Sequence, residues 1–339
     1  MSQLEPGAPM TVVSAAPEWL FRQAIRVPFA YRPVECDVGL RQQGALVIDE
    51  AATAERWRSF AAGWESLVEF ESRWLRAAGA SVVLGDVPPL AFAAAAAAGV
   101  PSLALANFSW DWIYRHFVAR EPVLGQAAAL CAQAYADCGL LLRLPFSGDL
   151  SAFPRLEDVP LVARRPRVGR DDVRRLLGLA AGAPLVLLSF GGIGLPGFDL
   201  GVLGGLEEMH FVTVGETLRS ERNVTVLPPA ALDTHGLGYE DLVGAAEVVV
   251  TKPGYGIVSD AIGAGTRLVY TDRGDFPEYP ILVREMAGYL PTAYVSNEDL
   301  LAGRLADPIR RVLAAPLPPA PDTGGATVVA RKLLAAALG

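Results

Sequence analysis

The amino-acid sequence predicts an α/β protein of two Rossmann-like domains that face each other across a cleft. The chain has 339 residues, which is about twice the length of an ordinary single domain. Strand-like and helix-like segments alternate along it, as they do in proteins with parallel sheets. A stretch rich in proline, glycine and mixed charge, residues 145–170, separates two such blocks. We therefore expect an N-terminal domain at residues 1–150, a linker at 151–170 and a C-terminal domain at 171–339.

In the N-terminal block, strand-like runs alternate with apolar helices. The strand-like runs lie at residues 10–15, 81–86 and 101–107. In the stretch 53–79, aromatic and aliphatic residues recur about every 3.6 positions, which predicts a single helix with one aromatic face on the sheet. The alanine-rich run at 90–100 is shorter than the ~20 residues that cross a bilayer. We expect it to form a packed helix that ends at Gly99.

The C-terminal block repeats this alternation. Strand-like runs lie at residues 185–190, 211–214, 224–227, 247–251 and 268–271. A helix is expected at 257–264, because Gly265 stands where a helix usually ends. A final helix is expected at 326–338. Ser296, with Asp299 three residues later, has the pattern of a helix-capping box.

Composition and charge exclude several classes of protein. A hydrophobic content of 52% with 19% charged residues is that of a compact protein and not of a disordered one. The net charge of −8 argues against nucleic acid as a partner, because phosphate binding needs a basic surface. The three cysteines lack metal-ligand spacing and cannot all pair, which favours the reducing cytoplasm. Residues 1–9 do not read as a signal peptide, and no membrane span is expected.

The strand at 247–251 is followed by a turn suited to phosphate binding. Gly254 and Gly256 carry no side chains, and the helix after them presents unpaired N–H groups and a partial positive charge at its start. A diphosphate fits this environment, and Lys252 adds a mobile positive charge. Asp260 is expected in the first turn of the helix. There it either binds a group beyond the phosphate, such as a ribose diol, or only complements the helix dipole.

A second glycine-rich loop, "SFGGIGLPGFD" at residues 189–199, follows another strand. It contains a G-x-G-x-x-G pattern, which formally matches a dinucleotide-binding fingerprint and leaves a nicotinamide-dependent oxidoreductase as an alternative. Pro196 interrupts the turn, so we retain a narrower expectation. Gly191 and Gly192 allow backbone N–H groups to approach a phosphate.

Acidic and aromatic residues follow two of the N-terminal strands. Asp86 ends one strand, where catalytic groups gather in such sheets, and Asp111 lies in the segment "NFSWDWIY" from Asn107. Either carboxylate is a candidate base that takes the proton of a substrate hydroxyl. Trp110 and Trp112 of the same segment either stack on a sugar face or pack in the core.

Residues 251–279 resemble the donor-nucleotide motif of glycosyltransferases with the GT-B fold, including the "THCGWNS…E" core of plant UDP-sugar transferases. The whole chain is similar to a bacterial group of glycosyltransferases related to the N-terminal half of plant arabinokinases. Three segments that carry this likeness are "NFSWDWIY" from Asn107, "EDVPLVAR" from Glu157 and "KPGYGIVSDAIGAGT" from Lys252. The likeness implies a GT-B fold over nearly the whole chain.

The resemblance assigns the nucleotide to residues around the glycine turn. Lys252 occupies the place of a phosphate-contacting histidine. The backbone amides of Gly256 and Ile257 occupy the place where the diphosphate is met. Asp260 falls on the glutamate that holds the ribose hydroxyls in the family.

The resemblance assigns the donor sugar to two further carboxylates. Asp275 and Glu278 fall on an Asp-Gln pair that binds sugar hydroxyls, a task that suits ionised carboxylates; the alternative is a solvated loop. No Asp-x-Asp metal motif follows a strand in the sequence. We therefore expect no metal and no cofactor, with Lys252 and the helix dipole stabilising the leaving diphosphate.

The start of the chain departs from the family. Related chains begin with a strand and a Gly-His-Gly turn, which residues 1–9 do not contain. We expect that the N-terminal domain lacks its first strand and that the recorded start is too late. The run at 10–15 must then pair directly with the strand at 81–86 or leave both with unpaired backbone groups, which cost about 1–3 kcal/mol each when buried.

The sequence thus predicts a glycosyltransferase of the GT-B type. It would move a sugar from a nucleotide-sugar donor to a hydroxyl acceptor, with inversion at the sugar carbon and with the donor site in the C-terminal domain. The alternative is a catalytically silent protein that binds a nucleotide sugar as a sensor or partner subunit.

Overall fold

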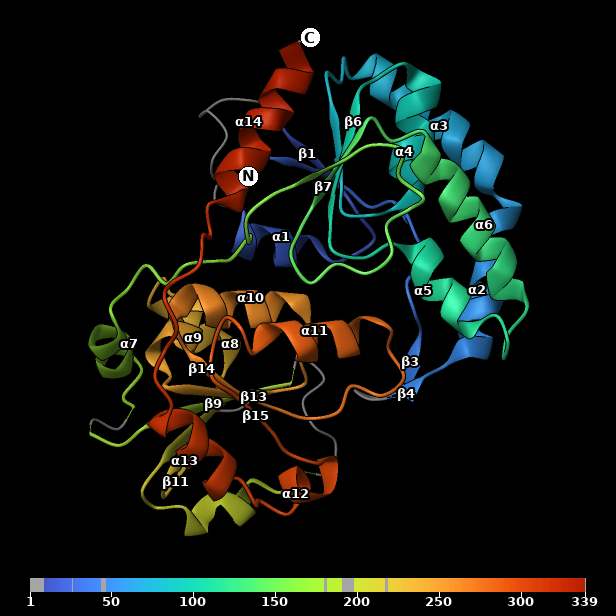
Figure 1. Ribbon diagram of the computed structural model, residues 1–339. Coiled ribbons are helices and arrows are strands. Elements are labelled where there is room, and N and C mark those ends of the chain that lie inside the picture. The colour runs from blue at the N-terminus through green and yellow to red at the C-terminus, as the bar shows by residue number, and fades with distance from the viewer. Residues whose placement is uncertain are drawn as a thin grey trace.

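The computed structural model describes residues 9–25, 27–43, 47–179, 182–190, 198–216 and 219–338. The chain forms two α/β domains, one above the other in Figure 1, which confirms the predicted fold class. Extended segments join the domains at the left of this view. Within the described ranges, no helix is long and apolar enough to cross a membrane.

The N-terminal domain is built on a four-stranded parallel sheet in the order β5-β6-β7-β8. Its strands are β5 (Val83–Gly85), β6 (Ser102–Ala106), β7 (Leu140–Arg143) and β8 (Leu156–Asp158). Its helices are α1 (Glu18–Ala24), α2 (Glu50–Ala62), α3 (Trp64–Ala77), α4 (Pro89–Ala98), α5 (Trp110–Phe117) and α6 (Val123–Ala136). The alanine-rich run forms α4, which ends at Gly99 in the left-handed conformation with φ +72°, as predicted.

Two small sheets complete the N-terminal domain. They are β1 (Thr11–Val13) with β2 (Ala30–Arg32), and β3 (Gln42–Gln43) with β4 (Val47–Ile48). In the part of the chain that the structure describes, β1 pairs with β2 and not with β5. Of the two arrangements expected for the run at 10–15, direct pairing with the strand at 81–86 is therefore wrong. Strand β1 hydrogen-bonds to β2, and strand β5 hydrogen-bonds to β6.

The prediction of a single helix at 53–79 is also wrong. Gly63 ends α2 and precedes α3, because glycine has a low helix propensity and allows the chain to turn. The aromatic face is present on α2, where Trp57 and Phe60 are buried in the core of the domain.

The C-terminal domain contains a seven-stranded sheet in the order β11-β12-β10-β9-β13-β14-β15. Its strands are β9 (Leu185–Ser189), β10 (His210–Val214), β11 (Arg219–Glu221), β12 (Val224–Leu227), β13 (Val248–Thr251), β14 (Arg267–Tyr270) and β15 (Thr292–Tyr294). Its helices are α7 (Arg170–Leu176), the 3-10 helix η1 (Leu200–Gly205), α8 (Pro229–Thr234), α9 (Tyr239–Ala245), α10 (Tyr255–Ala264), α11 (Glu278–Met286), α12 (Asn297–Leu301) and α13 (Ala306–Ala314). The strands are parallel except for β11, and the order is that of a doubly wound fold.

Helices cover both faces of this sheet. Leu188 and Val250 pack with Ile309 of α13 on one face, whereas Leu187 and its neighbours pack with Leu242 of α9 on the other. Strands that are buried on both faces carry continuous apolar runs, which explains why their sequences predicted them well.

The predicted domain boundaries need two corrections. Strand β8 lies inside the predicted linker but pairs with β7, so it belongs to the N-terminal sheet. The last helix, α14 (Gly325–Leu338), returns to the N-terminal domain, where Val329 and Leu333 pack against Leu103 of β6. The chain therefore passes between the domains twice. A β-bridge between Val162 and Gly324 joins the two passing segments.

Candidate functional site

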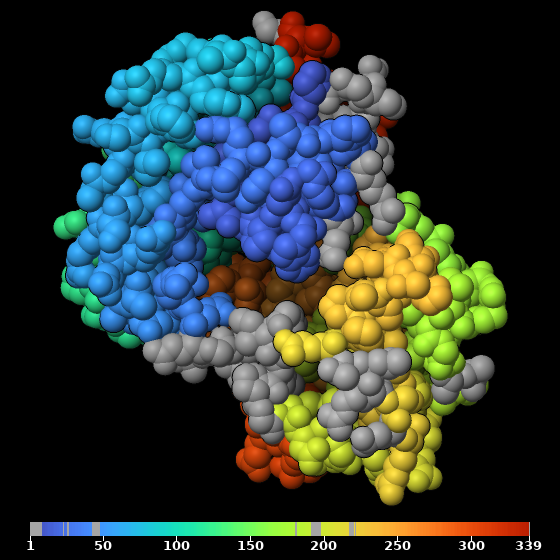
Figure 2. Space-filling model, turned by 180° about the vertical axis from the view of Figure 1, so that it is seen from behind, coloured from blue at the N-terminus to red at the C-terminus, as the bar shows by residue number. Residues whose placement is uncertain are grey.

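The two domains enclose a hollow. It lies between the blue atoms of the N-terminal domain and the orange and yellow atoms of the C-terminal domain in Figure 2. In the C-terminal sheet, β9 and β13 are neighbours at the centre. From β9 the chain continues outward to β10 on one side, and from β13 it continues outward to β14 on the other side. Doubly wound sheets bind ligands at the carboxyl ends of the strands at such a switch point. Strand β13 ends there at Thr251, directly before Lys252 and the start of α10.

The start of α10 offers an uncovered group of backbone N–H donors. Gly254 is the N-cap in an extended conformation, and α10 has ten residues. A Cβ atom added at Gly256 would meet no atom within 4 Å, so the space beside this turn is open. Ile257, also in the first turn, is anchored against the apolar cluster around α9. A helix start of this kind attracts anions through its unpaired N–H groups and its dipole.

Two cationic side chains lie beside this helix start. An added Cβ at Gly254 would lie 3.7 Å from Nη1 of Arg273, and the Arg273 guanidinium also stacks 4.1 Å from the ring centre of Phe276. Partial burial, and then the charge of Arg273, lower the pKa of Lys252. Sequence reasoning identified Lys252 but missed Arg273, which stands two residues before Asp275 in the same sequence motif.

The sequence predicts Asp260 in the first turn of α10. The residue lies in the second turn, because the helix begins at Tyr255. Its side chain is 2% exposed. The carboxylate accepts hydrogen bonds from the backbone N–H and the Nε of Arg164, both at 3.0 Å, and also pairs with Nη2 of Arg164. Burial raises the pKa of Asp260, while Arg164 acts in the opposite direction. A ribose would reach this carboxylate only after Arg164 moves aside.

Glu278 links the two domains. It is 3% exposed and accepts hydrogen bonds from Nδ2 of Asn107 at 2.6 Å and from Nη1 of Arg273 at 2.7 Å. Asn107 follows β6 in the N-terminal domain, and Arg273 follows β14 in the C-terminal domain. The loop after β14 is thus attached to the N-terminal domain at the edge of the hollow.

Asp275 makes a second contact between the domains. Its carboxylate lies 2.6 Å from Nε2 of His116 and 2.6 Å from Nη2 of Arg120, near the end of α5. Partial burial raises the pKa of Asp275, but the hydrogen bonds and the charges of His116 and Arg120 together lower it by more than burial raises it, so the net shift is downward. The side chain is 55% exposed and is also paired with protein side chains, so the two alternatives for Asp275, a sugar ligand and a solvated loop residue, both stay predictions.

On the N-terminal side, Asp86 follows β5 and keeps an exposed side chain. Although the residue as a whole is exposed, protein atoms surround its carboxylate group. The loss of hydration, and then the charges of Asp37 and Glu278, raise the pKa of Asp86 to about 6. The next residue, Val87, is fully buried with φ +53°, which is unusual for a β-branched side chain. Backbone strain of this kind clusters at functional sites.

The prediction that Asp111 acts as a base is wrong for this structure. Asp111 is 1% exposed and lies 3.0 Å from Nη2 of Arg115, so a substrate hydroxyl has no access to it. The tryptophans beside it are packed in the domain. Trp110 donates a hydrogen bond from Nε1 to Asp37 at 3.0 Å, and Trp112 packs against Gly148.

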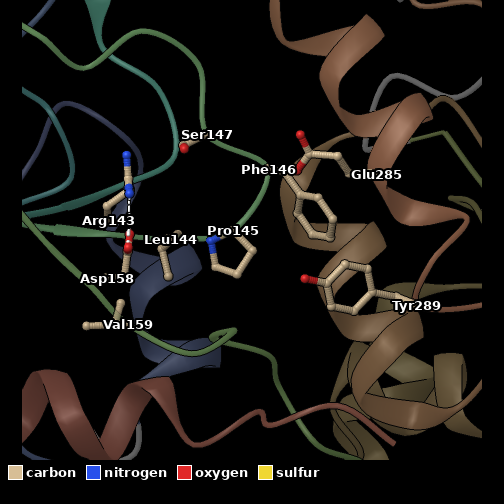
Figure 3. Close-up of a pocket in the computed structure, with 9 residues that line it drawn as sticks. All are labelled: Arg143, Leu144, Pro145, Phe146, Ser147, Asp158, Val159, Glu285 and Tyr289. Carbon is tan, nitrogen blue, oxygen red and sulfur yellow. Dashed lines mark hydrogen bonds and ion pairs between the residues drawn. The ribbon is translucent and has the colours of Figure 1, made fainter. Parts of the chain in front are cut away.

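A separate groove of about 370 Å³ lies at the junction of the domains. Figure 3 shows Phe146 and Tyr289 facing each other from the two domains, with Arg143 paired to Asp158. Its other lining residues are Leu144, Pro145, Ser147, Val159 and Glu285. None of the predicted donor or acceptor residues lines this groove, so we assign it to the hinge.

The structure therefore brings together part of the predicted site. Six predicted residues lie at the start of α10 or beside the hollow: Lys252, Gly254, Gly256, Ile257, Glu278 and Asp86. Asp275 makes the second contact between the domains. Asp260 and Asp111 are buried elsewhere. Gly191 and Gly192 lie outside the described residues. Sequence reasoning missed Arg273, Asn107 and Asp37, whose partners are distant in the chain or lie in unpatterned loops.

No protein-family model matches the chain. The curated protein L-arabinokinase from Arabidopsis thaliana is 32% identical over 313 residues, which are 91% of this chain and 30% of that protein. The chain thus spans less than a third of the length of this curated relative.

Solved structures of similar fold cover almost the whole chain. The glycosyltransferase of kitacinnamycin has a TM-score of 0.54 at 18% identity and covers 97% of this chain and 95% of that one. Arabidopsis thaliana UGT89C1 has a TM-score of 0.58 at 14% identity, with 97% and 87% covered. A UDP-glucosyltransferase from Polygonum tinctorium has a TM-score of 0.58 at 12% identity, with 99% and 88% covered. The chain therefore has the GT-B fold of glycosyltransferases and is related in sequence to part of the plant L-arabinokinase.

Proposed function

We propose that the protein is a glycosyltransferase that moves a sugar from a nucleotide-sugar donor to a hydroxyl acceptor, with inversion and without a metal ion. One observation carries this proposal. The start of α10 in the C-terminal domain, with Lys252 and Arg273 beside it, lies close enough to Asp86 of the N-terminal domain for Asp86 to act electrostatically on Tyr255. Anion binding and proton acceptance are thus available on opposite sides of one space.

The reaction uses these groups as follows. The donor diphosphate binds at the uncovered N–H groups of α10, and Lys252 and Arg273 stabilise the negative charge that grows on it as it leaves. Asp86 accepts the proton of the acceptor hydroxyl, since a carboxyl with a pKa of about 6 is mostly ionised near neutral pH. The acceptor oxygen bonds to the anomeric carbon as the bond to the diphosphate breaks. Direct displacement inverts that carbon.

The relatives guide the choice of substrates to test. The solved structures of UGT89C1 include complexes with UDP and with quercetin, so UDP-sugars and aromatic hydroxyls are the first candidates. The kinase activity in the name of the curated relative is outside the proposal, because the chain spans 30% of that protein and folds as glycosyltransferases do. The three cysteines are unpaired thiols, and we assign the protein to the reducing cytoplasm.

A second candidate is a catalytically silent protein that binds a nucleotide sugar. The observation that favours it is the occupation of three carboxylates assigned to the donor. Asp260, Asp275 and Glu278 all bind protein side chains in this structure. Turnover of the donor distinguishes the candidates, because a silent protein binds the nucleotide sugar without forming a glycoside or free sugar.

Calorimetric binding of UDP, GDP and ADP in the presence of EDTA tests the proposal. Lys252→Ala and Arg273→Lys should each weaken the best nucleotide by about 10- to 100-fold, the value of a hydrogen bond between charged groups. Lys332→Ala is the matched control, because Lys332 lies on α14 and pairs with Glu157 away from the hollow. NADH should not bind. Binding of NADH without any nucleoside diphosphate would overturn the transferase assignment.

Gly256→Ala tests whether the diphosphate binds at this turn, because it adds one methyl group to the space assigned to the phosphates. The added methyl group meets no protein atom, and alanine favours a helix over glycine by about 0.5–1 kcal/mol, so the variant should be slightly more stable. It should nevertheless bind the nucleotide more weakly, because the methyl group enters the space assigned to the phosphates. Unchanged affinity would move the diphosphate away from this turn.

A further inference from the structure

The loop at residues 33–41 holds a second carboxylate in a fixed position beside α5. Trp110 donates from Nε1 to Oδ2 of Asp37 at 3.0 Å. The hydroxyl of Tyr114 donates to the carbonyl of Gly39 at 2.9 Å, and the rings of Trp110 and Tyr114 stack with centres 5.5 Å apart. The loop is therefore attached to α5 at Asp37 and again at Gly39, which leaves the carboxylate little freedom to turn away.

The same elements hold the turn that carries Asp86. The backbone N–H of Leu90 bonds to the carbonyl of Cys36, the residue before Asp37. The hydroxyl of Tyr135 donates to the carbonyl of Val87 at 2.7 Å and accepts from the backbone N–H of Trp110 at 3.3 Å. One hydroxyl thus connects the strained residue after Asp86 with the tryptophan that holds Asp37. The two carboxylates belong to a single rigid assembly.

The charges around the pair are mostly negative. The negative charge of Asp37 raises the pKa of Asp86 more than that of Glu278 does. The charge of Asp86 in turn contributes to the raised pKa of Tyr255 in α10. Glu278 is already bonded to a cation and an amide, whereas the donor that holds Asp37 is a neutral indole. Cys36 and Glu35 are the titratable neighbours of Asp37 within the loop. Burial raises the pKa of Asp37, and the hydrogen bond from Trp110 opposes this rise. Burial raises the pKa of the Cys36 thiol to about 12, so this thiol stays neutral.

We propose that Asp37 is a positioning residue for Asp86, and that the two carboxylates form one proton-accepting unit in the hollow. In its ionised form, Asp37 strengthens the attraction of Asp86 for the proton of the acceptor hydroxyl. This inference rests on the proposed function, in which Asp86 is the base. It assigns a role to a loop residue that the sequence motifs did not identify.

The pH dependence of kcat/KM tests the unit. Removal of the negative neighbour makes Asp86 easier to ionise, so Asp37→Asn should move the acidic limb of the profile to lower pH by about 0.5–1 unit. The rate on the plateau should fall several-fold, because the remaining base is weaker. Asp149→Asn is the matched control: this carboxylate of the same domain pairs with Arg115, and its variant should leave the limb in place. A purely structural Asp37 would lower the rate without moving the limb.

A substrate-free titration separates this inference from the proposed function. Carboxyl carbon-13 NMR follows Asp86 in the wild type and in Asp37→Asn, with Asp86→Asn identifying the signal. A midpoint near pH 6 that falls in Asp37→Asn supports the unit even if no nucleotide sugar is turned over, in which case only the transferase proposal fails. An unmoved midpoint overturns the unit. Asp37→Ser, whose hydroxyl can still accept from Trp110, is measured alongside with the same expectation, so the test does not depend on one folded variant.

Discussion

Arg164 and Asp260 form an ion pair with unequal exposure, and this inequality predicts which half matters more for stability. Asp260 is 2% exposed, whereas the side chain of Arg164 is 51% exposed. Arg164→Met leaves a buried carboxylate without its cation, which costs about 3–5 kcal/mol. Asp260→Asn leaves a guanidinium that can turn to water and keeps an acceptor for the backbone N–H. Its cost should be about 1.5–3 kcal/mol, the value of a hydrogen bond to a charged group.

The two variants should also differ in their response to pH. Burial raises the pKa of Asp260, and Arg164→Met removes the cation that opposes this rise. A carboxyl whose pKa is higher in the folded state binds its proton more tightly there, so stability falls as the pH rises above the unfolded value of about 3.9. The deficit of Arg164→Met should therefore be small near pH 4 and largest near pH 8. Asp260→Asn has no titrating group at this position, and its deficit should change little.

Urea denaturation, followed by two signals, measures these differences. All six tryptophans lie before residue 113, so their fluorescence follows the N-terminal domain, whereas circular dichroism follows both domains. Arg175→Met is the control, because the side chain of Arg175 is 72% exposed and pairs with Asp172, three residues earlier in the same helix. Equal losses from Arg164→Met and Asp260→Asn, or a loss from Arg164→Met that does not grow with pH, would refute the reasoning.

Three other outcomes follow from the structure. Asp260→Asn should weaken nucleotide binding by about 10- to 100-fold in calorimetry if the carboxylate binds ribose, and unchanged affinity would remove it from the site. Gly148→Ala should destabilise the N-terminal domain by about 1–3 kcal/mol in urea, since the new Cβ would lie 2.3 Å from the ring of Trp112; an unchanged midpoint would contradict this packing. Asp275→Asn should cost about 0.2–1 kcal/mol, because the side chain is 55% exposed. Its contribution is present above the unfolded pKa and is lost as the pH falls through the lowered pKa, so a deficit that persists in strong acid would argue against these ion pairs.

Local patterns in the sequence predicted most of the fold. Val248–Val250 predicted a buried strand, because an apolar run without alternation is typical of a parallel sheet covered on both faces. Gly99 and Gly265 predicted two helix ends, and both adopt the left-handed conformation that glycine allows. The break at Gly63 was missed because the helical period continues across it from α2 into α3.

The candidate site was harder to predict, because its contacts join distant parts of the chain. Asp260 fits a ribose-binding motif by spacing, but its partner Arg164 lies 96 positions earlier in a segment without regular structure. Asp37 meets Trp110 across 73 positions. Asp86 directly follows β5, whereas Asp111 lies in the first turn of α5 and its side chain is buried in the core. Spacing within a motif does not specify such packing.

The paired crossings between the domains determine how they can move. The bridge between Val162 and Gly324, and the bond from Arg165 to Thr323, bind the two passing segments side by side. Gly325 sits so close to Pro160 that an added Cβ would lie 2.1 Å from its carbonyl oxygen, which keeps the segments in tight register. A single connecting segment would let one domain swivel freely on the other. Two joined segments resist twisting of one domain against the other, and any opening of the hollow would have to break the bonds that Glu278 and Asp275 make to the N-terminal domain.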